Sequence, residues 1–125
     1  MPDGAPIVRA IDVGALDPIV PPDGSTVREI ARPPDAENQS LAQAIVDPAG
    51  ETSAHLHRRS EEIYLFASGA GRMRLGHEAF DVEAGQAVVI PPGVAHKLWN
   101  TGPDPLVLFC CCSPPYSDDD TELLE

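Results

Sequence analysis

Three histidines and one glutamate are the residues of this sequence best suited to hold a metal ion. His55 and His57 are two positions apart, and on a β-strand such a pair projects from the same face. Their imidazoles could converge on one ion at about 2.1 Å, with Leu56 pointing the other way. Glu62 and His96 supply a carboxylate and a third imidazole. We predict that these four side chains meet at one divalent metal ion inside a small β-barrel.

The placement of Glu62 depends on a turn between it and His57. Glu62 follows His57 by five residues, an odd step that would put it on the opposite face of an uninterrupted strand. Residues 58–61 are polar and do not alternate, so we interpret them as a turn that restores the facing, with a new strand over 62–66. Glu61 is the alternative ligand if this turn is one residue shorter.

The setting of His96 also predicts a strand. It follows the Pro-Pro-Gly sequence at 91–93, which is a turn signal, and it opens a predicted strand over 96–100. Ligands carried on strands are held more rigidly than ligands on loops. The fourth histidine, His77, lies in a segment that we interpret as the exposed tip of a hairpin.

Acid–base chemistry would need a further side chain beside the ion. Tyr64 shares strand parity with Glu62 and should face the cavity, so it is our candidate catalytic residue. Glu61 and Glu83 are the other candidates for a base. The alternative role for Tyr64 is simple packing in the wall of the site.

Arginines and cysteines near the motifs could contribute as well. Arg58 and Arg59 could attract an anionic substrate at the barrel mouth, and Arg72 and Arg74 could bind a carboxylate or phosphate within the pocket. Solvent exposure is the alternative for each of the four. Residues 110–112 are all cysteine, so either the middle thiol or the outer pair faces inward, as a reactive group or as inert packing.

Together these residues resemble the two conserved motifs of the cupin superfamily. The second motif is matched in full by Gly85, Pro91, Gly93, His96 and Asn100. The first is matched by His55, His57, Glu62 and Gly69, but Ala49 stands where the family has its leading glycine. That departure changes a turn before the site rather than a ligand. The resemblance covers about residues 41–112.

The resemblance implies an all-β fold, a double-stranded β-helix or jelly-roll barrel. It implies the same four metal ligands, and a homodimer with the N-terminal strands as its expected contact. Cupins include isomerases, epimerases, dioxygenases, decarboxylases, lyases and non-catalytic binding modules. The family therefore indicates the site more closely than the reaction.

Three imidazoles and a carboxylate suit a divalent transition metal: Fe, Mn, Ni, Zn, Co or Cu. Four protein ligands complete a tetrahedral shell, whereas a six-coordinate ion keeps two positions open for substrate. If the protein is an enzyme, six-coordinate Fe, Mn or Ni is favoured. The donor set does not choose among these metals.

Composition restricts the classes of partner. The formal charge of −12 argues against binding to nucleic acid or to an anionic membrane surface. No stretch approaches the length of a transmembrane helix, and residues 1–10 lack the apolar run of a secretory signal. Three adjacent cysteines do not form a disulfide framework. We expect a cytoplasmic protein.

The chain reads as one domain in three segments. Residues 1–40 hold N-terminal strands and a loop, 41–112 the barrel, and 113–125 an acidic tail that we expect to be solvated. Further strands are predicted at 25–32, 41–47, 71–75, 79–83, 86–90 and 106–112, with 86–90 buried because it is almost continuously apolar. Ser117 could cap a short acidic helical turn in the tail.

These observations predict a metalloenzyme acting on a small polar metabolite. The expected reaction is isomerisation or epimerisation of a sugar or sugar acid, or oxygen-dependent dioxygenation. The alternatives are a non-catalytic, metal-dependent binding or sensor module, and a metal that only stabilises the barrel. No motif in the sequence names the substrate.

Overall fold

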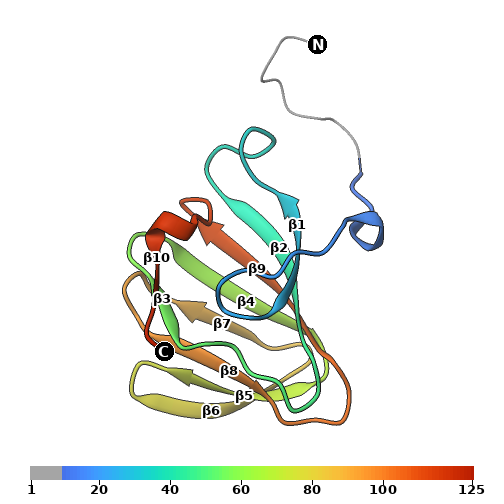
Figure 1. Cartoon of the computed structure of the whole chain (residues 1–125), viewed down its shortest axis with the longest axis vertical. Helices are drawn as coiled ribbons and strands as arrows, with labels where there is room; N and C mark the ends of the chain where they lie inside the picture. The colour runs from blue at the N-terminus through green and yellow to red at the C-terminus, as the bar shows by residue number, and fades with distance from the viewer. Residues whose placement is uncertain (1–9) are drawn as a thin grey trace.

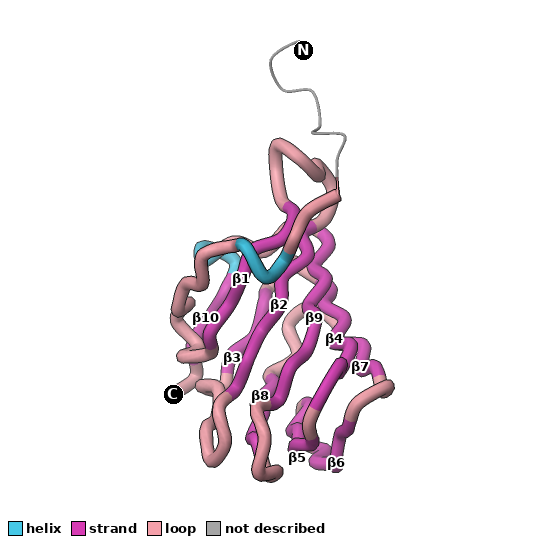
Figure 2. The backbone as a smooth tube through the Cα atoms, turned by 90° about the vertical axis from the view of Figure 1, so that its right-hand side faces the viewer, coloured by secondary structure: helices cyan, strands magenta, loops and turns pink. Residues whose placement is uncertain are grey.

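The computed structural model describes residues 10–125, which form two antiparallel sheets of five strands each (Figures 1 and 2). Sheet A has the order β1-β2-β9-β4-β7, and sheet B has the order β10-β3-β8-β5-β6. The strands are β1 Thr26–Ala31, β2 Ser40–Val46, β3 His55–His57, β4 Glu61–Ser68, β5 Ala70–Leu75, β6 Glu78–Glu83, β7 Ala87–Ile90, β8 His96–Asn100, β9 Leu106–Ser113 and β10 Thr121–Leu123. Two short 3-10 turns, η1 Val13–Ala15 and η2 Asp118–Asp120, complete the elements.

The predicted all-β jelly-roll class is confirmed by this arrangement of two facing sheets. Strands that are neighbours in a sheet come from distant parts of the chain, as β2 and β4 both pair with β9. None of the helices in the described part of the chain is long and apolar enough to cross a membrane.

The core lies between the sheets and is built by alternation along the strands. On β4, the inward residues Glu62, Tyr64 and Phe66 are buried, while their neighbours in sequence are exposed. Phe66, Met73, Leu98, Leu106 and Leu108 are each at most 2% exposed and belong to one cluster. Alternate residues of each strand therefore face the interior. On β4, the polar residue Glu62 lies in that interior beyond the end of the apolar cluster.

Strand β7 differs from its prediction. Its apolar run suggested a buried strand, but β7 is the edge strand of sheet A, and Val89 is 56% exposed on its outer face. Only Ile90 is buried. A continuous apolar run does not distinguish a two-sided core strand from an edge strand with an apolar outer face.

The C-terminal segment also differs, because it is part of the barrel rather than a solvated tail. Strand β10 pairs with β3, placing Thr121 opposite His57. Ser117 caps η2 as predicted, since its side chain accepts a hydrogen bond from the Asp119 N–H. Asp120 is buried, and its two carboxylate oxygens accept the N–H groups of Arg59 and Ser60. These bonds tie the end of the chain to the turn between β3 and β4.

Candidate metal centre

The four predicted ligands are placed by three strands from the two sheets. Strand β3 pairs with β8 so that His55 lies directly opposite His96, and His57 projects from the same face two residues on. The predicted turn after His57 is present, and β4 then turns Glu62 inward while Glu61 stays exposed. The structure therefore brings His55, His57, Glu62 and His96 together and leaves Glu61 outside the site.

The donor atoms of these residues converge in a buried cluster. The ligating nitrogens of the three histidines lie within 4.8 Å of one another, and each histidine is at most 4% exposed. Glu62 Oε1 lies 3.2 Å from His57 Nε2 and 3.4 Å from His96 Nε2. Burial alone would raise the pKa of Glu62, but when His57 and His96 are protonated at Nε2 their hydrogen bonds and charge outweigh burial and lower this pKa to about 2. The carboxylate is therefore ionised.

The outer nitrogens of the histidines fix how the inner ones can act. The Nδ1–H groups of His55 and His96 donate to the carbonyls of Ser53 and Val94, at 2.7 and 3.1 Å. His57 Nδ1 lies 2.9 Å from the Thr121 hydroxyl oxygen, which donates its own proton to the Ser117 carbonyl and so must accept here. In the neutral imidazoles, all three Nε2 atoms then carry a lone pair aimed into the cluster.

This arrangement fits a bound cation. Lone pairs of Nε2 atoms facing an ionised carboxylate repel unless positive charge lies between them. His96 Nε2 is buried and has no hydrogen-bond partner among the described residues. Buried polar atoms are seldom left unsatisfied in proteins. Three imidazole nitrogens and a carboxylate oxygen are suitable ligands for a divalent transition metal.

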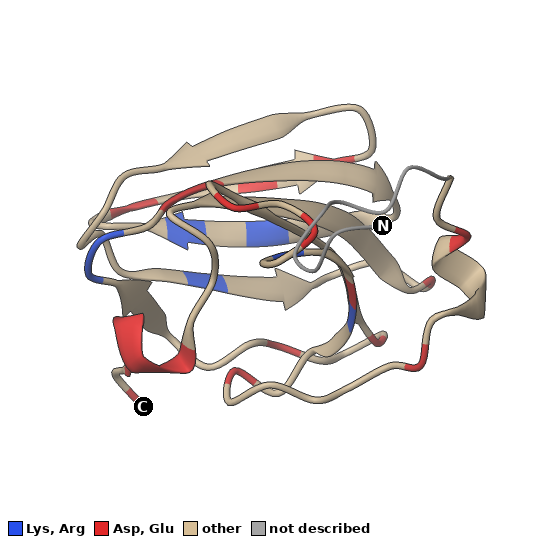
Figure 3. Ribbon diagram, turned by 90° about the horizontal axis from the view of Figure 1, so that it is seen from above, with Lys and Arg blue, Asp and Glu red and all other residues tan. Residues whose placement is uncertain are grey.

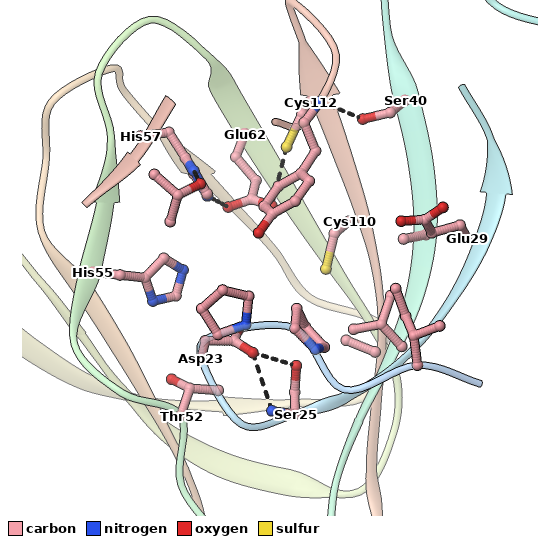
Figure 4. A pocket seen from close by; sticks show the side chains of 18 of the residues that line it. Asp23, Ser25, Glu29, Ser40, Thr52, His55, His57, Glu62, Cys110 and Cys112 are labelled. Carbon is pink, nitrogen blue, oxygen red and sulfur yellow. Dashed lines mark hydrogen bonds and ion pairs between the residues drawn. The ribbon is translucent and has the colours of Figure 1, made fainter. Parts of the chain in front are cut away.

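A cavity of about 320 Å³ opens beside the cluster and is lined by His55, His57 and Glu62 (Figure 4). Tyr64 also lines it, as its parity with Glu62 predicts, and its ring packs edge-on against His96 at a centroid distance of 5.9 Å. The Tyr64 hydroxyl has no hydrogen-bond partner within residues 10–125. Burial, with Glu62 adding to it, raises the pKa of Tyr64 well above its ordinary value, so the phenol is neutral.

The cysteines divide as one of the two predicted patterns requires. The outer pair, Cys110 and Cys112, lines the cavity, whereas Cys111 faces away toward Gln39. Cys112 Sγ donates to Glu62 Oε2 at 3.2 Å. Burial raises the pKa of both cavity thiols, and the charge of Glu62 raises them further. Protonated thiols are poor nucleophiles, so neither cysteine is set up for covalent chemistry in this structure.

None of the four arginines considered as substrate contacts faces the cavity, so the alternative of solvent exposure holds for each. Arg58 and Arg59 are exposed and pair with Glu122 and Asp120 of the C-terminal segment. Arg72 pairs with Asp81 on the outer face of sheet B, and Arg74 is exposed on the same face. Glu83 is exposed as well, and His77 lies in the exposed turn between β5 and β6.

Several residues at the cavity were not linked to it from the sequence, among them Asp23, Tyr116 and Thr121. Thr121 and Tyr116 lie in the segment that was interpreted as a solvated tail, so no pattern linked them to the site. Asp23 lies in a Pro-Pro-Asp-Gly turn, which indicates a loop but not what the loop faces. The N–H of Ser53 donates to the Asp23 carbonyl, and this bond holds the loop against the segment entering β3.

The Cupin domain family model matches residues 42–112, more than half of the chain. The chain belongs to the cupin family. It is 45% identical over 112 residues to the uncharacterized protein MJ1618 of Methanocaldococcus jannaschii, a match that covers 88% of this chain and 90% of that one.

Solved cupin structures share the fold. The polyketide cyclase RemF from Streptomyces resistomycificus superposes with a TM-score of 0.80 at 18% identity, over 95% of this cupin and 87% of that chain. Pac13, a nucleoside dehydratase, superposes with a TM-score of 0.78 at 14% identity, over 95% and 92% of the two chains. At these identities the likeness concerns the fold, and both neighbours are enzymes.

Proposed function

We propose that this cupin is a metal-dependent enzyme that moves a proton on a small metabolite carrying a carbonyl or hydroxyl group, as in isomerisation, epimerisation or elimination. The observation that carries the proposal is that Tyr64 lines the same cavity as His55, His57 and Glu62 of the candidate metal cluster. A metal with a purely structural role would need no such cavity. A barrel filled with side chains would give a substrate no access to the metal.

The roles of the side chains follow from their chemistry. His55, His57, His96 and Glu62 would hold the ion, which when bound polarises a carbonyl oxygen and acidifies the neighbouring C–H. The Asp23 carboxylate, which lines the same cavity and has only Oδ1 bonded to Ser25, would accept that proton and return it to the product. Tyr64, a neutral phenol with an unengaged hydroxyl, would donate a hydrogen bond to substrate oxygen as negative charge develops there. Leu108 adds an apolar side chain to the cavity wall and, like Phe66, belongs to the buried core.

Hydrogen exchange at carbon tests this proposal. The metal-loaded protein is incubated in D₂O with 2-hydroxyacetophenone and with D-xylose, and loss of the proton beside the carbonyl is followed by NMR. We expect exchange with at least one compound, and a fall of about 100-fold or more in Tyr64→Phe. Absence of exchange in protein shown to contain one ion per chain would overturn the proposal. Oxygen uptake in the same samples would instead favour the dioxygenase class.

Matched variants separate the chemical role of Tyr64 from packing. Tyr64→Phe keeps the ring that packs on His96 and Phe66, so metal content and thermal stability should match the parent protein. His77→Ala removes an exposed turn imidazole and should change neither activity nor metal content. His96→Ala should lose both.

A further inference from the structure

The cavity has almost no positive charge of its own. Among residues 10–125, Arg32 is the only lysine or arginine that lines it, and this guanidinium is paired with Glu29 at 3.0 Å. Arg28, which precedes Glu29 on β1, does not line the cavity, and its side chain donates a hydrogen bond to the Leu16 carbonyl. Within this part of the chain, an anionic substrate would thus meet no unpaired lysine or arginine at the cavity, and acidic residues outnumber basic ones around the fold (Figure 3).

Negative charge, by contrast, borders the cavity at several points. Asp23 and Asp118 line it in addition to the ligand Glu62, and neither pairs with a lysine or arginine of the described chain. These three carboxylates outnumber the two positive charges of a bound divalent ion. Asp23 is the more enclosed of the two free carboxylates, and it lies near His55 (Figure 4).

Asp23 is held in place by its own loop. The N–H and the hydroxyl of Ser25 both donate to Asp23 Oδ1, at 3.0 and 2.7 Å, which leaves Oδ2 without a partner in the described structure. Reciprocal backbone bonds between Ile19 and Val27 anchor the loop to β1. A carboxylate fixed in this way presents a constant negative charge to whatever enters.

The remaining wall combines hydroxyl groups with apolar surface. Ser25, Thr52 and Thr121 offer hydroxyls near the cluster, whereas Val27, Ala44 and Leu108 form an apolar wall further from it. The hydroxyl protons of Ser25 and Thr121 are already donated, to Asp23 Oδ1 and to the Ser117 carbonyl, so toward a ligand these oxygens act as uncharged acceptors. A cavity of about 320 Å³ is at the lower end of the range for small-molecule sites.

We infer that this cavity selects neutral or cationic molecules with an apolar body and one carbonyl or hydroxyl head, and rejects carboxylates and phosphates, with Asp23 as the residue that sets the charge preference. The inference rests on the proposed function for the role of the site, and it replaces the sugar-acid class expected from the sequence. Phosphorylated sugars are excluded on the same grounds.

Three probes of one shape test the preference: benzamidinium, benzamide and benzoate, which differ in charge on the same ring and planar head. Each is titrated into zinc-loaded protein and followed by NMR, with zinc content measured in every sample. We expect benzamide and benzamidinium to bind at least about fivefold more tightly than benzoate. Repulsion between two unit charges a few ångströms apart near a protein surface changes an affinity by about fivefold or more.

Two variants that each remove one negative charge then show whether Asp23 causes the charge preference. Asp23→Asn keeps an oxygen for Ser25 and should narrow the gap between benzamide and benzoate by about fivefold, while lowering the affinity for benzamidinium. Asp81→Asn, on the outer face of sheet B, should leave all three affinities unchanged. Tighter binding of benzoate than of benzamide, equal effects of the two variants, or no binding of any probe would each overturn the inference. If the zinc content of those samples is normal, such a result counts against the charge preference and not against the metal site.

Discussion

Cys112 Sγ and Glu62 Oε2 lie 3.2 Å apart, with the thiol donating to the oxygen that the histidines leave free. The other oxygen, Oε1, faces His57 and His96. The thiol thus occupies one side of the carboxylate and favours binding of the ion through Oε1 alone, which keeps coordination positions open for substrate.

Replacement of Cys112 should therefore change metal binding without removing a ligand. Partners of metal ligands are worth about 10-fold to 100-fold in affinity, so we expect Cys112→Val to weaken binding by about 10-fold and Cys112→Ser, which keeps a donor, to weaken it less. Competition titration with a chromophoric chelator measures both. Cys111→Val, on the outer face, is the control, and equal losses in Cys112→Val and Cys111→Val would contradict this role.

Thr121 should matter to the metal although it lies in the last strand. Its hydroxyl oxygen accepts from His57 Nδ1–H and so directs the Nε2 lone pair inward. Thr121→Val should lower metal affinity by about 10-fold, whereas Thr121→Ser should retain it. If the valine variant binds metal as the parent does, the tautomer of His57 is set by something else.

Ala49 adopts a backbone conformation that favours glycine. Its φ is 64°, in the left-handed region, at the position where the cupin motif has its leading glycine. Such a conformation costs a non-glycine residue about 1–2 kcal/mol. Ala49→Gly should therefore increase the free energy of unfolding by about 1 kcal/mol in urea denaturation. Ala87→Gly on β7 should have the opposite sign.

Asp120 should link stability to pH through its position under the turn between β3 and β4. Burial alone would raise the pKa of Asp120, but the N–H groups of Ser60 and Arg59 outweigh it and hold the pKa below its ordinary value. A group whose pKa is lower in the folded state stabilises the fold above its unfolded pKa, and this contribution is lost as pH falls through the folded value.

Asp120→Asn should consequently cost about 1–3 kcal/mol at pH 7, because one buried N–H loses its acceptor. The gap from the parent protein should stay constant above about pH 5 and close as pH falls below about 4. Urea unfolding at a series of pH values measures it, with exposed Asp119→Asn as the control. A gap that does not change with pH would show that the charge of Asp120 contributes nothing.

Strand parity predicted that His55 and His57 share a face. Glu62 needed an assumed turn after His57, which left Glu61 as the alternative, and the inward position of Glu62 on β4 decides between them. The same parity placed Tyr64 at the cavity. It could not decide which of the cysteines at 110–112 faces inward, since that depends on the register of β9 against β2 and β4.

The parts that sequence patterns missed depend on contacts between distant segments. Asp23 reaches the cavity because its loop is tied to Ser53, and Thr121 because β10 pairs with β3. The sequence left open whether the arginines face a substrate or solvent, because a charged residue on a strand or turn gives the same pattern in either position. The homodimer and the cytoplasmic location stay predictions.

The most direct test of the central claim is the metal content of the purified protein together with X-ray absorption at the bound ion. We predict one divalent transition metal per chain, with scattering from three imidazole rings and one carboxylate oxygen. The ion should be absent from His96→Ala and present in His77→Ala. Protein that takes up no ion after dialysis against Mn, Fe, Ni or Zn, or an ion without imidazole scattering, would contradict the account.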